Sequence, residues 1–97
     1  MQPKRQKAEP ATAASVEVTL RALLAETLGL PARRVAGFSE ATQLFGALPE
    51  FDSLAVANFL TAFEERFAVL IEDDDVEAED FATFGTLLAF TKRMTLR

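Results

Sequence analysis

The chain has 97 residues, a formal net charge of −5 at neutral pH, and neither cysteine nor histidine. A chain of this length forms one domain with a modest core, which excludes a deep active site built from many residues. Because cysteine and histidine are absent, the chain can form no disulfides and none of the usual zinc sites. The Ser-His-Asp and Cys-His mechanisms are also excluded.

The charge is distributed unevenly. Residues 1–14 are slightly basic and the rest of the chain is strongly acidic. An acidic domain repels nucleic acid and anionic lipid, and three basic residues are a weak sign of a nucleic-acid-binding arm. No apolar run approaches the length of about 18 residues that spans a membrane, and no apolar stretch follows the basic residues as in a secretory signal. We therefore expect a cytoplasmic location, no nucleic-acid partner and no membrane span.

The first predicted helix covers residues 16–28. Residues 1–14 contain two prolines and lack apolar periodicity, which predicts a disordered tail before a domain over residues 15–97. Ser15 is the expected N-cap, and Gly29 followed by Pro31 marks the end of the helix. One face carries the apolar residues Val16, Leu20, Leu23, Leu24 and Leu28.

A long connection, residues 29–52, follows the first helix and contains three glycines and two prolines. A connection of this length inside a small domain is expected to pack against the core or to have a function. The apolar residues expected to anchor it in the core are Val35, Phe38, Leu44, Phe45 and Leu48.

The second main helix is predicted from Asp52 or Ser53 to Phe67. Its apolar face comprises Val56, Phe59, Leu60, Phe63 and Phe67. The residues expected to lie mainly off this face are Ala55, Asn58, Thr61, Ala62, Glu64 and Glu65.

The last third of the chain begins with an acidic connection. A strand over residues 68–71 would have no partner, so a loop with a short helical turn near residues 78–82 is favoured. Thr83 is the expected cap of the last helix, and Lys92 and Arg93 suit the dipole at its end. Its predicted face comprises Phe84, Leu87, Leu88 and Thr91. The predicted fold is an all-α bundle of three main helices and one short one.

The segment that suggests chemistry is Asp52-Ser53-Leu54, where a loop meets a strongly amphipathic helix. Free backbone N–H groups and the positive end of the helix dipole converge on Ser53, so a phosphate attached to this serine would be well placed. Asp52 would cap the helix or help hold a metal ion during phosphoryl transfer. Taken alone, the tripeptide is more often only a helix cap.

An ordered set of motifs over residues 15–95 resembles the acyl carrier protein family. In that family, D-S-L opens a second helix ending in A-L-E-E-x-F. The matching segments here are Thr42-Gln43-Leu44, Asp52-Ser53-Leu54, Ala62-Phe63-Glu64-Glu65-Arg66-Phe67, Ile71-Glu72-Asp73-Asp74-Asp75 and Glu79-Asp80-Phe81-Ala82-Thr83-Phe84.

The resemblance implies a right-handed four-helix bundle and a non-enzymatic carrier. It implies that a separate phosphopantetheinyl transferase, using coenzyme A and magnesium, attaches 4′-phosphopantetheine to Ser53. The carrier would hold acyl groups as thioesters on this arm and present them to acyl-loading and acyl-accepting enzymes. We expect a monomer without catalytic residues or a metal site of its own.

A closer resemblance lies in residues 44–53, LFGALPEFDS. This segment is similar to free-standing bacterial carriers associated with exopolysaccharide and exosortase systems, in which L-L-G-A-L-P-E-L-D-S recurs. The similarity does not indicate the cargo.

Partner docking is expected along the edge of the second main helix formed by Leu54, Asn58, Thr61 and Glu65, with Glu64 beside it. Fatty-acid-synthesis carriers usually have acidic residues where this chain has Ala55 and Asn58. Glu64 and Glu65 remain as the charged contacts. Dedicated partners are therefore favoured over the general fatty-acid synthase.

Other interpretations are weaker. Asp73, Asp75 and Glu77 fit the start of an EF-hand loop, but Ala78 stands where glycine is needed and Phe84 where glutamate is needed. The nine phenylalanines fall mostly on predicted core positions, which favours packing over an aromatic binding surface. The alternative function is a helical protein-interaction domain without a prosthetic group. An enzyme is a distant third, since no G-x-S-x-G surrounds Ser53.

Overall fold

The computed structural model describes residues 12–96, so the predicted disorder of residues 1–11 lies outside the described part of the chain. Within it there are four α-helices, α1 (Ala13–Leu28), α2 (Ala32–Ala36), α3 (Ser53–Phe67) and α4 (Phe84–Thr95). Two 3₁₀ turns, η1 (Asp73–Asp75) and η2 (Ala78–Phe81), connect α3 to α4. No strand occurs over residues 12–96, and one isolated bridge joins Gln43 to Thr83. The predicted all-α, four-helix architecture is confirmed.

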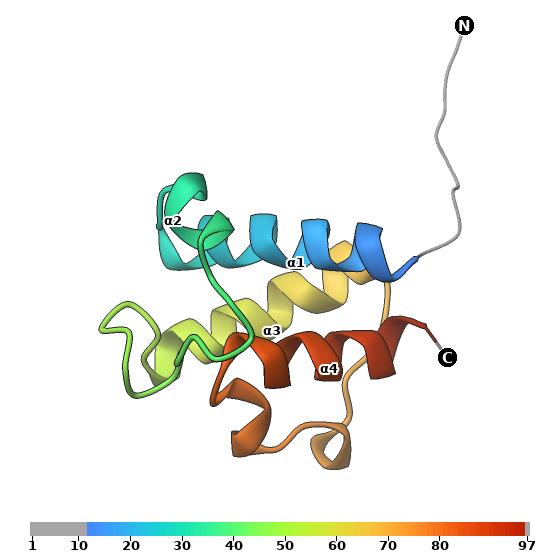
Figure 1. The fold of residues 1–97 in the computed structure, drawn as a ribbon. Coiled ribbons are helices and arrows are strands. Elements are labelled where there is room, and N and C mark those ends of the chain that lie inside the picture. The colour runs from blue at the N-terminus through green and yellow to red at the C-terminus, as the bar shows by residue number, and fades with distance from the viewer. Residues whose placement is uncertain (1–11, 97) are drawn as a thin grey trace, which may run out of the picture.

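The three long helices lie side by side, and α1 contacts α2, α3 and α4 (Figure 1). Helix α1 runs antiparallel to α3 and α4, so the two ends of the described chain lie at one end of the bundle. The N-terminal end of α3 lies at the opposite end (Figure 1). No helix in residues 12–96 is long and apolar enough to cross a membrane.

Helix α1 begins earlier than predicted. Thr12, not Ser15, is the N-cap: its side chain accepts from the Ser15 N–H at 3.1 Å, and the Ser15 Oγ accepts from the Thr12 N–H at 2.9 Å. Residues 12–14 are therefore cap and helix, and the prediction of a tail up to residue 14 was wrong there. Ala13 and Ala14 favour helix but add nothing to an apolar stripe, so periodicity missed them. The predicted end is confirmed, since Gly29 caps α1 with a φ of +68°.

The connection between α1 and α3 contains α2, which was not predicted because five residues are too short to show a period. Arg21 holds this region in place. Its Nη1 donates to the carbonyls of Val35 at 2.7 Å and Phe38 at 3.1 Å. Its guanidinium also lies 4.4 Å from the centre of the Phe84 ring, which joins α1, α2 and α4 through one side chain.

Most of the predicted anchors of this connection are correct. Val35, Phe38 and Leu44 are buried and Leu48 is half-buried, but Phe45 is 46% exposed. The Leu44 N–H donates to the Ala82 carbonyl at 3.0 Å, and the chain begins to turn at Phe45. This turn brings the Phe45 ring to the surface, so the prediction that it anchors the core was wrong.

Helix α3 follows the predicted bounds and places Phe59 and Phe63 in the core. Phe59 packs against Phe63 with tilted rings and 5.9 Å between ring centres, and Phe63 meets Phe90 of α4 at 5.5 Å. Ala55, expected mainly off the apolar face, is only 8% exposed, because the first turn of α3 also packs inward.

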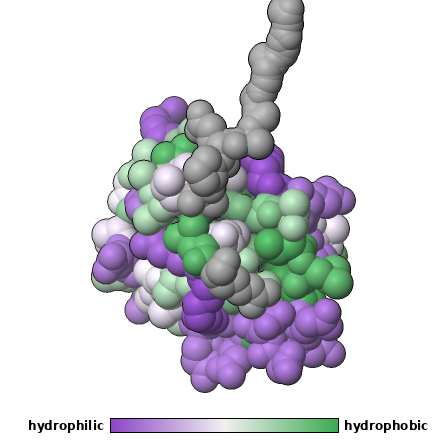
Figure 2. Space-filling view, turned by 90° about the vertical axis from the view of Figure 1, so that its right-hand side faces the viewer, coloured by the Kyte–Doolittle hydropathy of each residue, from purple (hydrophilic) through white to green (hydrophobic). Residues whose placement is uncertain are grey.

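The segment after α3 matches its prediction in outline. No strand forms over residues 68–71, and the expected short helical turn is η2. Thr83 caps α4 by accepting from the Thr86 N–H at 3.1 Å. The predicted face of α4 is buried, comprising Phe84, Leu87, Leu88 and Thr91. Figure 2 shows the end of the bundle where the described chain begins and ends, with hydrophilic residues covering its lower part.

Candidate functional site

Ser53 is the first residue of α3, and Asp52 before it is the N-cap. Asp52 has extended backbone angles, and its Oδ1 accepts from the Ala55 N–H at 2.9 Å. The predicted capping role of Asp52 is therefore confirmed. The serine side chain is exposed, and its Oγ forms no hydrogen bond within residues 12–96. Its hydroxyl is thus presented to solvent on a fixed helix end.

The backbone around Ser53 favours an anion. Asp52 satisfies one first-turn N–H, that of Ala55, while those of Ser53 and Leu54 have no acceptor in the described part of the chain. These groups and the dipole of a 15-residue helix provide partial positive charge at this end. A phosphate joined to Ser53 Oγ would lie beside them.

The chain has two other serines, and both hydroxyls serve local structure. Ser15 Oγ takes part in the capping box of α1 and donates to the Thr12 carbonyl at 3.1 Å. Ser39 Oγ lies 3.4 Å from Thr42 Oγ1 in a tight turn. Ser53 is therefore the serine whose position suits modification.

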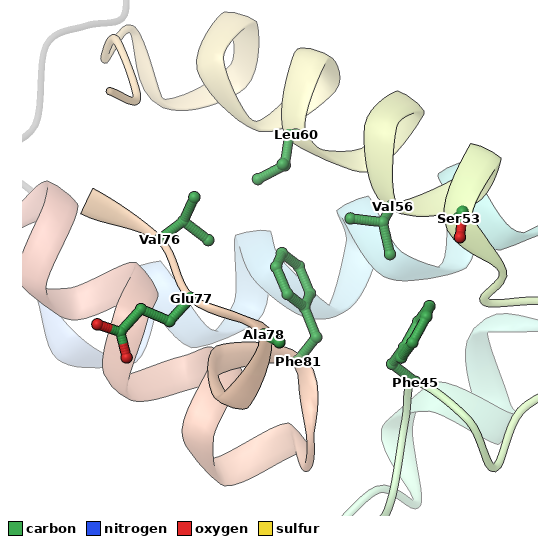
Figure 3. A pocket seen from close by; sticks show the side chains of 8 residues that line it. All are labelled: Phe45, Ser53, Val56, Leu60, Val76, Glu77, Ala78 and Phe81. Carbon is green, nitrogen blue, oxygen red and sulfur yellow. The ribbon is translucent and has the colours of Figure 1, made fainter. Parts of the chain in front are cut away.

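An apolar groove of about 310 Å³, here called the apolar groove, opens beside Ser53 (Figure 3). One wall is formed by α3, because Ser53, Val56 and Leu60 are spaced by three and four residues and share a helix face. The other residues that line it come from the connection and from the η2 region: Phe45, Val76, Glu77, Ala78 and Phe81. In Figure 3 the apolar side chains point into the groove, while the Glu77 carboxylate points away from them.

A second hollow of about 370 Å³ also borders Ser53. It is formed by the end of the connection, residues 45–49 and 51, together with Asp52 and Ser53. Phe45 and Ser53 line both hollows.

The connection is held against η2 and α2 by polar contacts. The Phe45 N–H donates to the Phe81 carbonyl at 3.0 Å, and the Phe84 N–H donates to the Thr42 carbonyl at 2.8 Å. Arg34 pairs with Glu50 at 3.3 Å, two residues before Asp52. These contacts fix the entry of the chain into α3 and thereby the position of Ser53.

The expected docking edge of α3 is exposed. Leu54 is 70% exposed, and Asn58, Thr61 and Glu65 also face solvent. Glu64 differs, since it is half-buried and its Oε2 accepts from the Ile71 N–H at 2.8 Å. Glu64 therefore stabilises the end of α3.

Sequence reasoning missed three residues of the apolar groove. Phe45 was assigned to the core, and Val76 and Ala78 lie in an acidic stretch with no pattern that indicates a pocket. Their role depends on the packing of η2 against the rest of the molecule, and no local signal reports it.

Comparison with known proteins gives two findings. Residues 18–91 match the family model described as the phosphopantetheine attachment site. The fold is similar to the solution NMR structure of a holo acyl carrier protein from Nitrosomonas europaea, with a TM-score of 0.70 and 36% sequence identity. That match covers 80% of this chain and 92% of the other. The chain belongs to the acyl carrier protein family and carries acyl groups on a covalently attached 4′-phosphopantetheine.

Proposed function

We propose that Ser53 Oγ is the attachment point of the 4′-phosphopantetheine arm. The observation that carries this proposal is the exposed Ser53 hydroxyl at the N-terminus of α3, beside the apolar groove. The site fits the group, because uncapped N–H groups lie next to the phosphate position and an apolar groove begins at the same residue. The arm supplies a terminal thiol on which the acyl group is held as a thioester.

The chain's own residues position Ser53 for modification. Asp52 caps α3 and holds Ser53 at the helix end, where a phosphopantetheinyl transferase can reach it. The second carboxylate oxygen of Asp52 would help that enzyme hold its metal ion. No His or Cys is present to attack a thioester, so we propose that the chain itself is not an enzyme.

We further propose that partner enzymes dock on the edge formed by Leu54, Asn58, Thr61 and Glu65. This edge adjoins Ser53 and is exposed along α3. Glu64 lies beside this edge, but its carboxylate accepts from the backbone of Ile71. Glu65 is the carboxylate of the edge and has no ion-pair partner within residues 12–96. We expect the carrier to act as a cytoplasmic monomer, with contacts to partners mainly apolar and polar.

The test of the attachment site uses intact-mass measurement. Wild type, Ser53→Ala and Ser39→Ala are incubated with a broad-specificity phosphopantetheinyl transferase and coenzyme A. We expect one arm on wild type and on Ser39→Ala, and none on Ser53→Ala. Labelling of Ser53→Ala would contradict the proposal by placing the arm on another residue. No labelling of the wild type would contradict it as well, and would favour an interaction domain without a prosthetic group.

A further inference from the structure

Gly85 is the second residue of α4, a helical position where glycine is less favourable than alanine. The space around it explains why glycine stands there. A Cβ atom added to Gly85 would lie 2.9 Å from the carbonyl oxygen of Glu40 and 3.0 Å from the Glu40 Cβ atom. The first of these contacts is a clash with backbone, so an alanine at this position would push the chain at Glu40 away from α4.

The close approach at Gly85 belongs to a short stretch of backbone pairing. Residues 40–45 and residues 81–85, here called the paired segments, run antiparallel, with a bridge between Gln43 and Thr83. Two of the hydrogen bonds between them satisfy first-turn N–H groups of α4, which the helix itself leaves unpaired. The four bonds are 2.8 to 3.0 Å long and run from the N–H of Gly85 to Glu40, of Phe84 to Thr42, of Leu44 to Ala82 and of Phe45 to Phe81.

The first paired segment leads directly to the surface around Ser53. It continues into residues 45–49, a largely exposed stretch that lines the second hollow together with Ser53. The turn in this stretch is built on a paired residue, because the Ala47 and Leu48 N–H groups donate to the Leu44 carbonyl at 3.0 and 2.8 Å. The pairing with residues 81–85 therefore holds the stretch in place beside Ser53.

An enzyme that acts at Ser53 comes close to this stretch. A transferase has to bring the phosphate of coenzyme A to Ser53 Oγ, and residues 45–49 share a hollow with that side chain. Phe45, Ala47 and Pro49 are exposed and apolar, so the stretch offers apolar contact area near the reacting atom. A stretch that is already held in its bound position loses less conformational entropy when the enzyme binds.

We propose that Gly85 is a positioning residue for the enzymes that act at Ser53. By leaving room for the Glu40 backbone, it allows the paired segments to close. The paired segments then hold residues 45–49 in the position that a phosphopantetheinyl transferase contacts. This inference rests on the proposed attachment of the arm to Ser53.

The first test compares apo wild type, Gly85→Ala and Gly37→Ala. Gly37 is the matched control, because it lies in the connection and an added Cβ would meet its nearest atom, the Arg34 carbonyl oxygen, at an ordinary 3.5 Å. Hydrogen exchange at the Leu44 and Phe45 amides should be faster in Gly85→Ala alone, and exchange within α1 and α3 should not change. With the carrier as the varied substrate of a phosphopantetheinyl transferase at saturating coenzyme A, Gly85→Ala should raise KM about two- to tenfold and leave kcat unchanged.

A disulfide across the paired segments separates positioning from folding. Gln43 and Thr83 are bridge partners. The hydrogen bonds next to them are donated by Leu44 and Phe84, so this is a non-hydrogen-bonded pair, with Cα atoms about 4.5 Å apart. A disulfide spans such a distance, and the chain has no cysteine of its own to interfere. In Gly85→Ala combined with Gln43→Cys and Thr83→Cys, oxidation should restore both the slow exchange and the low KM, and reduction should abolish them again.

An unchanged KM in Gly85→Ala would overturn the inference, whether or not hydrogen exchange became faster, and so would equal changes in Gly37→Ala. If Gly85→Ala does not fold by circular dichroism, the oxidised triple variant decides: a folded protein with the KM of wild type supports the inference, and a raised KM overturns it. A wild type that takes no arm, read by intact mass, would overturn the attachment site and this inference with it.

Discussion

At the scale of single residues, phenylalanines of the same chemistry have different roles because of where they lie. Phe63 is fully buried and contacts three aromatic rings, Phe59, Phe67 and Phe90. Phe63→Ala should therefore lower the free energy of unfolding by about 3–5 kcal/mol, through lost burial and the cavity left behind. Phe45→Ala should cost much less, because nearly half of that ring is already in water.

Urea unfolding of wild type and both variants, followed by circular dichroism, measures the difference. An equal loss of unfolding free energy in the two variants would contradict the assignment of Phe63 to the core and of Phe45 to the surface.

At the scale of elements, α3 presents three sides: a buried side, a side that lines the apolar groove, and the exposed edge on which we propose that partners dock. Fatty-acid-synthesis carriers usually have acidic residues at the two positions that are Ala55 and Asn58 here. Ala55 is buried and Asn58 is exposed on this edge, so position 58 is the one at which an acidic residue would reach a partner.

Asn58→Glu is therefore the change that brings the docking edge nearer to the fatty-acid-synthesis pattern.

We expect Asn58→Glu to make this carrier a better substrate for a fatty-acid-pathway malonyl transacylase, because partner enzymes of that pathway commonly present basic patches. The initial rate of malonyl transfer to the holo protein measures this. Ala89→Glu is the matched control, since Ala89 is exposed on α4 and the change adds the same net charge away from the edge. If both variants gain equally, net charge and not the docking edge sets the rate. If Asn58→Glu gains nothing, position 58 does not determine partner choice.

At the scale of the whole molecule, we expect the fold not to depend on the arm. The core joins α1, α3 and α4, and Ser53 is exposed with no side-chain hydrogen bond among residues 12–96. Ser53→Ala should therefore keep the helical circular dichroism spectrum and melt cooperatively, within about 0.5 kcal/mol of the apo wild type, as surface substitutions usually do. Loss of the cooperative melt in Ser53→Ala would show that this serine has a structural role that its position does not reveal.

The sequence by itself determined the long helices and the candidate serine. The apolar stripes of α1, α3 and α4 repeat at helical spacing, and Gly29, Asp52 and Thr83 mark helix ends through local hydrogen bonding. These features depend on residues a few positions apart, so they can be read along the chain. Ser53 was found in the same way, from its place at a helix start within an ordered set of motifs.

Only the tertiary structure decided which apolar residues are core and which line the apolar groove. Phe45, Val56 and Phe81 meet there from three separate segments, and no spacing along the chain reports their contact. The short helix α2 likewise depends on Arg21, whose bonds reach carbonyls 14 and 17 residues away. Burial is a property of the packed molecule, so a residue such as Phe45 is assigned to the core or the surface only when the segments that surround it are in place.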